Sequence, residues 1–336
     1  MRIGVVSDAH LFHKNTDAHL YKQVLQELQN KNVDYIVDCG DVLDKNTIDS
    51  VQSSILYDIF SNITTPMHIV RGNHESLSGT SLTSILKMNK NIIIHNDIEI
   101  SDGMLFVPYT NSVSELINKL NALDLTSSVK FAFSHLNLTS NLYAMIPFQK
   151  MQNLFLFADN WFNGHIHTPE YQSSLYGEIH NVGSVSSLTY GDEHIPCYMI
   201  ITTDDNNNNN DVKIKKYNIF GSVIHKTVDI SSGEDLFKLG DFYNSNKDYR
   251  IAWRVKLPNS FSVTEKENIR TILASFHNTY EIQFSYLKTT ITKQNNTILQ
   301  QTTNKQLSMI KQLFQNYEKD TGVILNKELK RELETL

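Results

Sequence analysis

The stretch NWFNGHIHTPE, residues 160–170, places His165 and His167 two positions apart, directly after a glycine. Neutral imidazole is the commonest side-chain ligand of transition metals, so the pair is a candidate for metal binding. Two histidines at this spacing are also typical of an exposed turn. The rest of the chain therefore has to decide between these two interpretations.

Further residues that can bind metals or move protons stand just past predicted strands. They occur in the motifs SDAH, CGDVLD, RGNHE and FSHLN, and NGHIH contains the pair already named. The full set of candidates is Asp8, His10, Asp41, Asn73, His74, His135, His165 and His167. Oxygen and imidazole ligands without thiolate suit manganese, iron or zinc better than magnesium. Two divalent ions about 3.5–4 Å apart can clamp the attacking and the leaving oxygen of a displacement at phosphorus. The set therefore favours a two-metal centre over separate structural residues.

Strands alternate with helices in the first part of the chain. RIGVV leads to Asp8, VDYIVDCG to Asp41 and MHIVRGNH to Asn73, with a helical pattern of apolar residues in each gap. This β-α-β-α-β order predicts a parallel sheet with helices packed on its faces. The ligand site of such a sheet lies at the carboxyl ends of its strands. Later strands are predicted at 103–109, 129–135, 177–183, 197–203 and 212–220, with an exposed hairpin tip at 204–211.

The chain divides into three predicted regions. Residues 1–224 contain the alternating elements and all the candidate ligands, and residues 225–291 run strand, helix, strand, helix, strand. Residues 292–336 are predicted to be helical, with two apolar stripes that can pack on the chain's own domain or on a partner. The expected fold class is therefore α/β, followed by a small α+β domain and a C-terminal helical tail.

Composition describes an ordinary globular protein with a sizeable core, because the 336 residues are 40% hydrophobic and 20% charged. A formal charge of −6 argues against a globally basic nucleic-acid coat, although residues 213–226 carry four lysines and no acid. No apolar run is long enough to span a membrane and no secretory signal is recognised, so we expect a cytoplasmic protein without membrane contact. Cys39 and Cys197 are expected to be buried and reduced.

The ordered motifs D-x-H, G-D, G-N-H-[DE], H and G-H-x-H resemble the calcineurin-like metallophosphoesterase superfamily. Within it, GDVLD at 40–44 and NVGSVSSLTYGDEHIPCYMI at 181–200 resemble the SbcD and Mre-eleven nuclease branch, including the small subunit of phage recombination endonucleases. The resemblance implies a metallophosphoesterase β-sandwich core with flanking helices in residues 1–224. It also implies a DNA-facing α+β cap in 225–291 and an ATPase-binding helical region in 292–336.

The resemblance also assigns roles to the candidate residues by motif. One metal would be held by Asp8, His10 and His167, the other by Asn73, His135 and His165, and Asp41 would bridge the two.

In the same family scheme His74 stays off the metals and is the catalytic acid that protonates the leaving oxygen. Glu75 is expected to orient His74, because a carboxylate partner commonly fixes a histidine tautomer. Two positions depart from the family pattern: Phe12 replaces the usual glycine, and Glu75 replaces the more frequent aspartate. Neither change removes a ligand, but Phe12 makes the substrate fit near it uncertain.

The function implied is a manganese-dependent DNA exo- or endonuclease that acts in recombination, repair and replication. It would be the catalytic subunit of a complex with an SMC-like, ABC-type ATPase of the SbcC kind, and would form a homodimer. A phage-encoded chain would work in the host cytoplasm. One alternative is a stand-alone metallophosphatase of the same superfamily. A non-catalytic scaffold is disfavoured, because His74 would then have no purpose.

The remaining candidates carry weaker signals. His13 is expected in an exposed loop, His68 is expected to pack within a sheet, and Arg71 fits a phosphate contact and an ion pair equally well. No partner spacing is recognised for His95, His180, His194, His225 and His277. A dimer face could come from Leu82, Ile85, Leu86 and Met88, which could equally pack inward.

Overall fold

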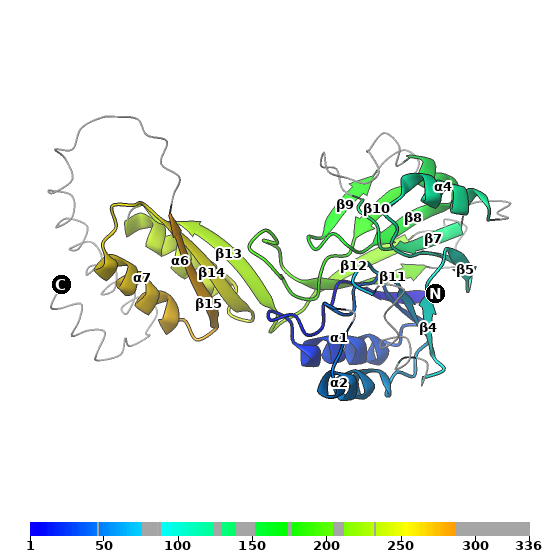
Figure 1. Cartoon of the computed structure of the whole chain (residues 1–336), viewed down its shortest axis with the longest axis horizontal. Coiled ribbons are helices and arrows are strands. Elements are labelled where there is room, and N and C mark those ends of the chain that lie inside the picture. The colour runs from blue at the N-terminus through cyan, green and yellow to red at the C-terminus, as the bar shows by residue number, and fades with distance from the viewer. Residues whose placement is uncertain are drawn as a thin grey trace. The chain divides into compact units, whose positions relative to one another are not determined.

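The structure, a computed structural model, describes residues 1–45, 47–75, 86, 89–123, 129–138, 152–173, 177–203, 212–231 and 233–286. The chain forms two compact units (Figure 1). The first comprises Met1–His225 with Asp248–Ile251, and the second Lys226–Lys247 with Ala252–Leu336. The predicted helical tail and the tract 204–211 lie outside the described residues.

The first sheet carries the predicted strand and helix alternation. Its strands, in the order β12-β11-β1-β2-β3-β4, are β1 (Arg2–Val6), β2 (Tyr35–Asp38), β3 (Met67–Val70), β4 (Ile92–His95), β11 (Cys197–Thr203) and β12 (Val212–Asn218). Strands β1 to β4 are parallel, whereas β11 pairs antiparallel with both β1 and β12. The parallel arrangement predicted for the β-α-β-α-β part is therefore confirmed, and the antiparallel strands β11 and β12 make the sheet mixed. A short connection such as 204–211 suits an antiparallel pair, because a parallel pair needs a longer crossover.

The second sheet packs against the first. Its strands, in the order β5-β6-β7-β8-β10-β9, are β5 (Glu99–Ser101), β6 (Met104–Val107), β7 (Val129–Ser134), β8 (Ala158–Asn163), β9 (Glu170–Ser173) and β10 (Glu178–Asn181). The inner strands β6, β7, β8 and β10 are parallel, and the edge strands β5 and β9 are antiparallel to their neighbours. The carboxyl ends of parallel strands are thus available in both sheets.

Helices cover only the outer face of each sheet (Figure 1). Helices α1 (Ala18–Asn30) and α2 (Ser50–Phe60) pack on the first sheet, and α4 (Val113–Asn121) and the 3-10 helix η1 (Gln152–Leu156) pack on the second. The inner faces bury a shared core that includes Val5, Phe106 and Phe133. The first unit is therefore a four-layer sandwich of helices, sheet, sheet and helices, because each sheet hides its second face against the other.

Local sequence explains how the elements nearest the site begin. Val5 of β1 faces the core between the sheets and Val6 the core under the helices, so β1 is apolar on both faces. Helix α1 begins after Asp17, whose carboxylate accepts a hydrogen bond from the His19 amide at 2.9 Å. Helix α2 begins with a capping box in which Asp49 and Gln52 bond each other's backbone amides.

The second unit contains the predicted order of strands and helices. Its elements are β13 (Val223–Asp229), α6 (Gly233–Ser245), β14 (Arg250–Leu257), α7 (Val263–Ser275) and β15 (Thr279–Tyr286), with the strands in the order β13-β14-β15. Trp253 of β14 is fully buried, and its ring centroid lies 5.7 Å from that of Phe242 in α6. Tyr243 stacks on Phe276 at 4.2 Å. The unit thus has an aromatic core of its own.

Three other expectations have outcomes in the described part of the chain. Leu86 is buried in the core of the first unit, whereas Leu82, Ile85 and Met88 lie outside the described residues. Cys39 and Cys197 are both free and buried. Among the described residues, no helix has the length and apolarity that crossing a bilayer requires.

Candidate metal centre

The candidate ligands lie on loops that follow parallel strands of both sheets. Asp8 and His10 follow β1, Asp41 follows β2, Asn73 and His74 follow β3, His135 follows β7, and His165 and His167 follow β8. Backbone hydrogen bonds tie these loops together: the Asp8 amide donates to the Gly40 carbonyl at 2.9 Å, and the His10 amide to the Asp41 carbonyl at 2.9 Å. The sandwich therefore collects side chains from five separate segments at one place.

The backbone of these loops is unusual. Asp8, His10, Asp41 and His165 have φ angles of 52°, 41°, 54° and 70°. Non-glycine residues rarely adopt this left-handed region, and such conformations concentrate at functional sites. Phe12 also has a φ of 74°, which explains why the superfamily usually places glycine there. The loop keeps the shape that suits glycine although its residue is bulky.

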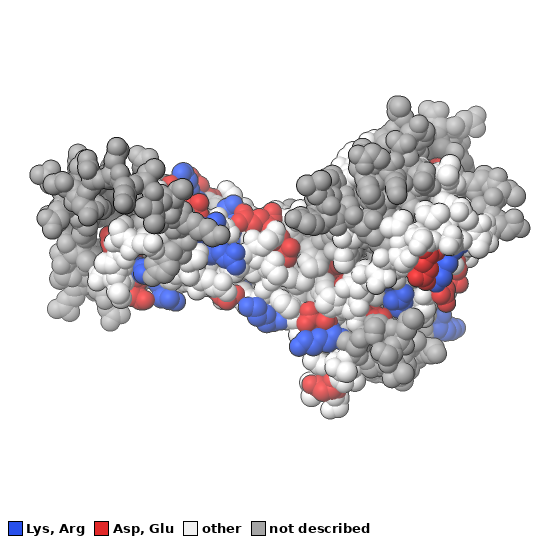
Figure 2. Space-filling view, turned by 45° about the horizontal axis from the view of Figure 1, so that its top comes forward, with Lys and Arg blue, Asp and Glu red and all other residues white. Residues whose placement is uncertain are grey.

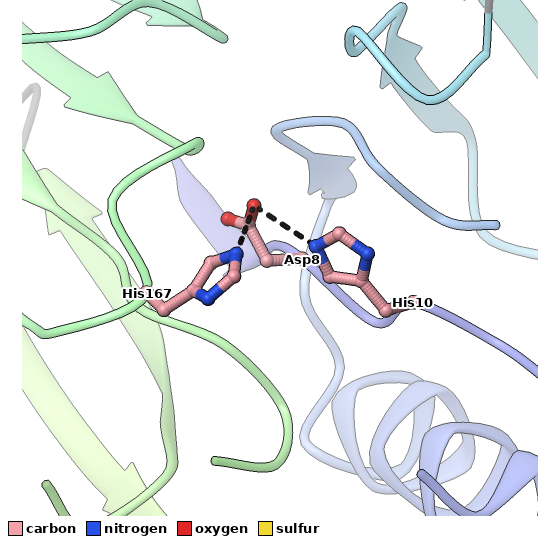
Figure 3. A group of neighbouring side chains, drawn as sticks. All are labelled: Asp8, His10 and His167. Atoms are coloured by element: carbon pink, nitrogen blue, oxygen red, sulfur yellow. Dashed lines mark ion pairs between the residues drawn. The ribbon is translucent and has the colours of Figure 1, made fainter. Parts of the chain in front are cut away.

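Asp8, His10 and His167 form the first ligand group, with one ligand atom of each within 4.8 Å of the others. One Asp8 carboxylate oxygen lies 3.8 Å from His10 Nε2 and 3.8 Å from His167 Nε2 (Figure 3). These distances are too long for hydrogen bonds. Both ring nitrogens of His10 are buried without a hydrogen-bond partner. A bound cation suits this arrangement, because a buried polar group without a partner is costly.

Asp41, His135 and His165 form the second ligand group. His135 Nε2 lies 3.2 Å from an Asp41 carboxylate oxygen, and its Nδ1 donates to the Cys39 carbonyl at 2.7 Å. The Asn73 amide oxygen lies 3.1 Å from His135 Nε2 and 2.9 Å from His165 Nδ1. The Cys39 carbonyl thus fixes the tautomer of His135 and leaves Nε2 facing the group.

Asp41 belongs to the second group and also lies close to His10 of the first. Its Oδ2 atom lies 3.2 Å from His135 Nε2 and 3.7 Å from His10 Nε2. Burial opposes ionisation of Asp41, but His135 and His10 outweigh it and hold the pKa of this carboxyl well below its usual range. In return, Asp41 raises the pKa of His135 to about 9 against the effect of burial. Asp41 thus lies between His135 of the second group and His10 of the first, and its role as the bridge stays a prediction.

His74 lies at the edge of the centre and is partly exposed. Its Nδ1 lies 2.6 Å from the Asp44 carbonyl, which can only accept a hydrogen bond, so this nitrogen carries a proton. Its Nε2 lies 3.9 Å from the Asp41 carboxylate. His74 also forms a possible ligand group with His10 and Asp41, so distance alone does not separate an acid from a ligand. Its role as the acid stays a prediction.

The prediction that Glu75 orients His74 is wrong. The Glu75 carboxylate accepts hydrogen bonds from the amides of Asp41 at 3.0 Å, Leu43 at 2.8 Å and Gly72 at 2.9 Å. Burial and then the Asp41 charge raise the pKa of Glu75 to about 7. Glu75 therefore fastens the loop of Asp41 to the loop of Asn73 instead of holding an imidazole.

The five histidines without a recognised partner spacing all have partners in the fold. They pair as His95 with His68 and Glu99, His180 with Glu178, His194 with Ser184, His225 with Ser187, and His277 with Tyr243. Most of these partners lie on other elements, and only folding brings them together. His68 is buried in β3 as predicted. The guanidinium of Arg71 donates to the Tyr109 carbonyl at 3.0 Å, and its contact with a phosphate stays a prediction.

Sequence reasoning missed two carboxylates beside the ligands. An Asp192 oxygen lies 3.4 Å from Nδ1 of His167, and an Asp44 oxygen lies 3.7 Å from Nδ1 of His10. The available signal was their place in the two segments that resemble the nuclease branch, GDVLD and 181–200.

Comparison with known families identifies the class of this site. The family described as calcineurin-like phosphoesterase superfamily domain matches residues 1–206. The chain therefore belongs to the calcineurin-like phosphoesterase superfamily. It is a metal-dependent phosphoesterase, and the two His and Asp groups are the dimetal site typical of that superfamily. The comparison with curated proteins finds no match.

Solved structures resemble the chain only distantly. A novel archaeal phosphodiesterase is 17% identical over 65% of this chain and 100% of its own, with a TM-score of 0.39. A dimetal phosphatase from Danio rerio is 12% identical over 65% and 96%, with a TM-score of 0.40. Vps29 of Entamoeba histolytica complexed with zinc is 16% identical over 65% and 99%, with a TM-score of 0.35. At these scores the likenesses carry no conclusion about the substrate.

Proposed function

We propose that the chain is a nuclease that hydrolyses phosphodiester bonds of DNA with two manganese ions. The observation that carries the proposal is the second unit. It has its own sheet, helices and aromatic core, whereas the metal centre is complete within the first unit. An enzyme for small phosphate esters has little use for such an addition, whereas a polymer substrate extends well beyond the reacting phosphate.

DNA contact would depend on local positive charge. Figure 2 shows Lys and Arg side chains mixed with Asp and Glu on the face in view, in keeping with the net charge of −6. Strand β12, by contrast, exposes Lys213, Lys215 and Lys216, and lysines that neutralise phosphates give salt-dependent binding. We therefore expect DNA affinity to fall steeply with added salt.

A stand-alone metallophosphatase is the second candidate. The family match supports it more directly than it supports the nuclease, because the match covers residues 1–206 and includes neither the second unit nor the tail. On this view the second unit has another purpose, and small phosphate esters are the substrates.

The proposed mechanism divides the work among residues of the first unit. Asp8, His10 and His167 would hold one ion, Asn73, His135 and His165 the other, and Asp41 both. When bound, the ions supply Lewis acidity toward the phosphate and offset its developing negative charge. His74 donates its Nδ1 proton in a hydrogen bond to the Asp44 carbonyl, so Nε2 is the nitrogen that, in the doubly protonated imidazolium, would give its proton to the leaving oxygen.

Manganese is the proposed ion because of the donor set. The two groups and Asn73 offer four imidazoles together with carboxylate and amide oxygens, and magnesium prefers all-oxygen octahedral shells. We expect manganese to support far more turnover than magnesium at equal concentration. Equal rates with both ions would overturn the choice of manganese.

The deciding experiment offers the full-length chain four substrates with manganese: end-labelled single-stranded DNA, end-labelled duplex DNA, bis-p-nitrophenyl phosphate and p-nitrophenyl phosphate. Cleavage of DNA that is lost on His74→Gln supports the nuclease. Turnover of p-nitrophenyl phosphate without any DNA cleavage supports the phosphatase. Gel positions of the labelled products also distinguish exonuclease from endonuclease action.

The ATPase partner is proposed from the sequence alone, because residues 287–336 lie outside the described part of the chain. Apolar residues there recur at helical spacing as Leu307, Ile310, Leu313, Phe314 and Tyr317, and again as Leu325, Leu329, Leu333 and Leu336. Truncation after Lys293 should leave manganese binding intact but abolish co-purification with an SMC-like ATPase of the SbcC type. Unchanged partner affinity would refute this. The proposed homodimer is tested separately by sedimentation equilibrium.

A further inference from the structure

Segment 181–200 follows the last ligand motif and contacts both the backbone and the side chain of His167. The Ser184 amide donates to the His167 carbonyl at 2.9 Å. Gly183 has a φ of 85°, and a Cβ atom there would lie 3.0 Å from the same carbonyl and 2.5 Å from Pro169 Cγ. The close approach and the left-handed backbone both require glycine at this position. The segment therefore fixes the main chain of His167.

Asp192, in the same segment, reaches the imidazole of His167. Its Oδ2 atom lies 3.4 Å from His167 Nδ1 and accepts hydrogen bonds from the Thr189 amide at 2.9 Å and the Leu188 amide at 3.2 Å. The Thr189 hydroxyl donates to this oxygen at 3.2 Å. Three donors of the chain thus hold the carboxylate at the imidazole nitrogen that faces away from Asp8.

The turn that carries Asp192 is itself anchored. The Ser187 hydroxyl donates to the Asp192 carbonyl at 2.7 Å, and the Ser187 amide donates to the Val223 carbonyl at 2.9 Å. Ser187 Oγ also lies 2.9 Å from Nδ1 of the buried His225. Because Ser187 is fully buried, the position of Asp192 is set by the folded core of the first unit.

The other nitrogen of His167 faces the ligand group, with Nε2 3.8 Å from the Asp8 carboxylate. A histidine ligand that donates its second N–H to a carboxylate is held in one tautomer and one orientation, and it becomes a stronger ligand. His135 receives the same help from a neutral carbonyl, that of Cys39 at 2.7 Å. Asp192 is a charged acceptor, so it strengthens the His167 imidazole more than a carbonyl would.

We infer that Asp192 is a positioning residue that tunes the affinity of the first metal position through His167. The inference rests on the proposed two-metal function, but it concerns one position only. It also explains what segment 181–200 contributes, because this segment supplies the acceptor behind the last ligand of the centre.

The test measures manganese binding by the full-length chain, with free ion followed by electron paramagnetic resonance. Asp192→Asn keeps the size of the side chain and removes its charge. It should weaken one of two manganese sites by about 10- to 100-fold and leave the other near wild type. Glu193→Gln is the matched control, because it makes the same change at the next, exposed position. It should bind as wild type does.

A double variant identifies the position affected. His167→Gln should lose the first site, and adding Asp192→Asn to it should change binding no further, because both changes act on one ligand. Wild-type binding by Asp192→Asn would overturn the inference. Equal weakening of both sites, with a lower melting temperature in chelator, would show a merely structural role and would also overturn it. Failure of the wild-type chain to bind two ions would instead refute the two-metal proposal.

Discussion

Two clusters of buried imidazoles beside carboxylates in the first unit differ in the distances between their side chains. In the metal centre, His10 Nε2 lies 3.8 Å from Asp8 and 3.7 Å from Asp41. In the second place, between β3, β4 and β5, His68 Nδ1 lies 2.9 Å from His95 Nε2, and His95 Nδ1 lies 2.7 Å from the Glu99 carboxylate. Around His10 the first cluster leaves room for an ion, whereas hydrogen bonds join the two rings and the Glu99 carboxylate in the second, which we call the closed cluster.

The backbone accounts for this difference. His68 and His95 stand on neighbouring parallel strands, whose regular spacing lets the rings meet and stack beside Phe106, with His95 at 3.8 Å. The metal ligands stand on loops, and Asp8, His10, Asp41 and His165 hold left-handed conformations. Residue type alone therefore does not separate a metal site from a structural cluster. The conformation that holds the residues does.

The largest effect should come from removing Asp41, the carboxylate proposed to bridge the two ions. Asp41→Ala leaves two close cations without a common anion, so we expect both manganese sites to empty together. Turnover should fall by at least about a thousandfold, because the charge stabilisation supplied by both ions is lost. Atomic absorption after gel filtration measures the metal content. Asp97→Ala, at a side chain that is 85% exposed, is the control. Loss of one ion alone would contradict the bridging role.

His74 should show a large effect on turnover without an effect on metal. Changing it to Gln should lower turnover by about a hundred- to ten-thousandfold, the usual contribution of a general acid. The manganese content should stay at two ions per chain by the same measurement. If an ion is lost together with activity, His74 is a ligand, as its place beside His10 and Asp41 allows.

Most residues of the metal centre could be predicted from the sequence. Carboxyl ends of parallel strands converge, so residues that follow apolar runs, such as Asp8, Asp41 and Asn73, were expected at one edge. The structure brings them together with His135 and His165. The order of motifs added the expectation of a bridge, and Asp41 lies 3.7 Å from His10 and 3.2 Å from His135, one residue of each ligand group.

The contacts of the closed cluster, and those of the carboxylates beside the metal ligands, could not be predicted in this way. His68 meets His95 across 27 positions of the chain, and Asp192 meets His167 across 25, so no local spacing reveals either pair. Strand β8, which positions His165, received no predicted bounds, because ADNWFN breaks the apolar alternation with Asp159 and Asn160. These contacts follow from sheet order and loop path, which periodicity does not specify.

The closed cluster should show itself in the pH dependence of stability. Burial and then His95 lower the pKa of His68 from 6.5 to about 4, and burial lowers the pKa of His95. Between pH 4 and pH 6.5 the unfolded chain binds a proton at His68 that the native chain does not. The stabilisation is therefore present at pH 7 and is lost as pH falls from 6.5 toward 4. His68→Phe should reduce the loss of unfolding free energy between pH 7 and pH 5 by about 2 kcal/mol.

Urea unfolding in chelator at both pH values measures this loss, and titration of the metal ligands cancels between the two proteins. His19→Gln, at an exposed position of α1, is the control and should retain the wild-type pH dependence. An identical pH dependence for His68→Phe would show that the closed cluster does not exclude protons.

The smallest effect should come from changing Asp44, which makes one hydrogen bond through its carbonyl and one longer contact through its carboxylate. Its carbonyl holds His74 Nδ1 at 2.6 Å, whereas its carboxylate lies 3.7 Å from His10 Nδ1, too far for a hydrogen bond. Asp44→Asn keeps the carbonyl, so the orientation of His74 should persist and turnover at saturating manganese should match wild type. The manganese concentration for half-maximal turnover should rise by less than about tenfold, at or below the low end for a carboxylate behind a ligand. A loss of turnover comparable to that of His74→Gln would mean that the carboxylate acts in the reaction, and distance would then be a poor guide to role in this centre.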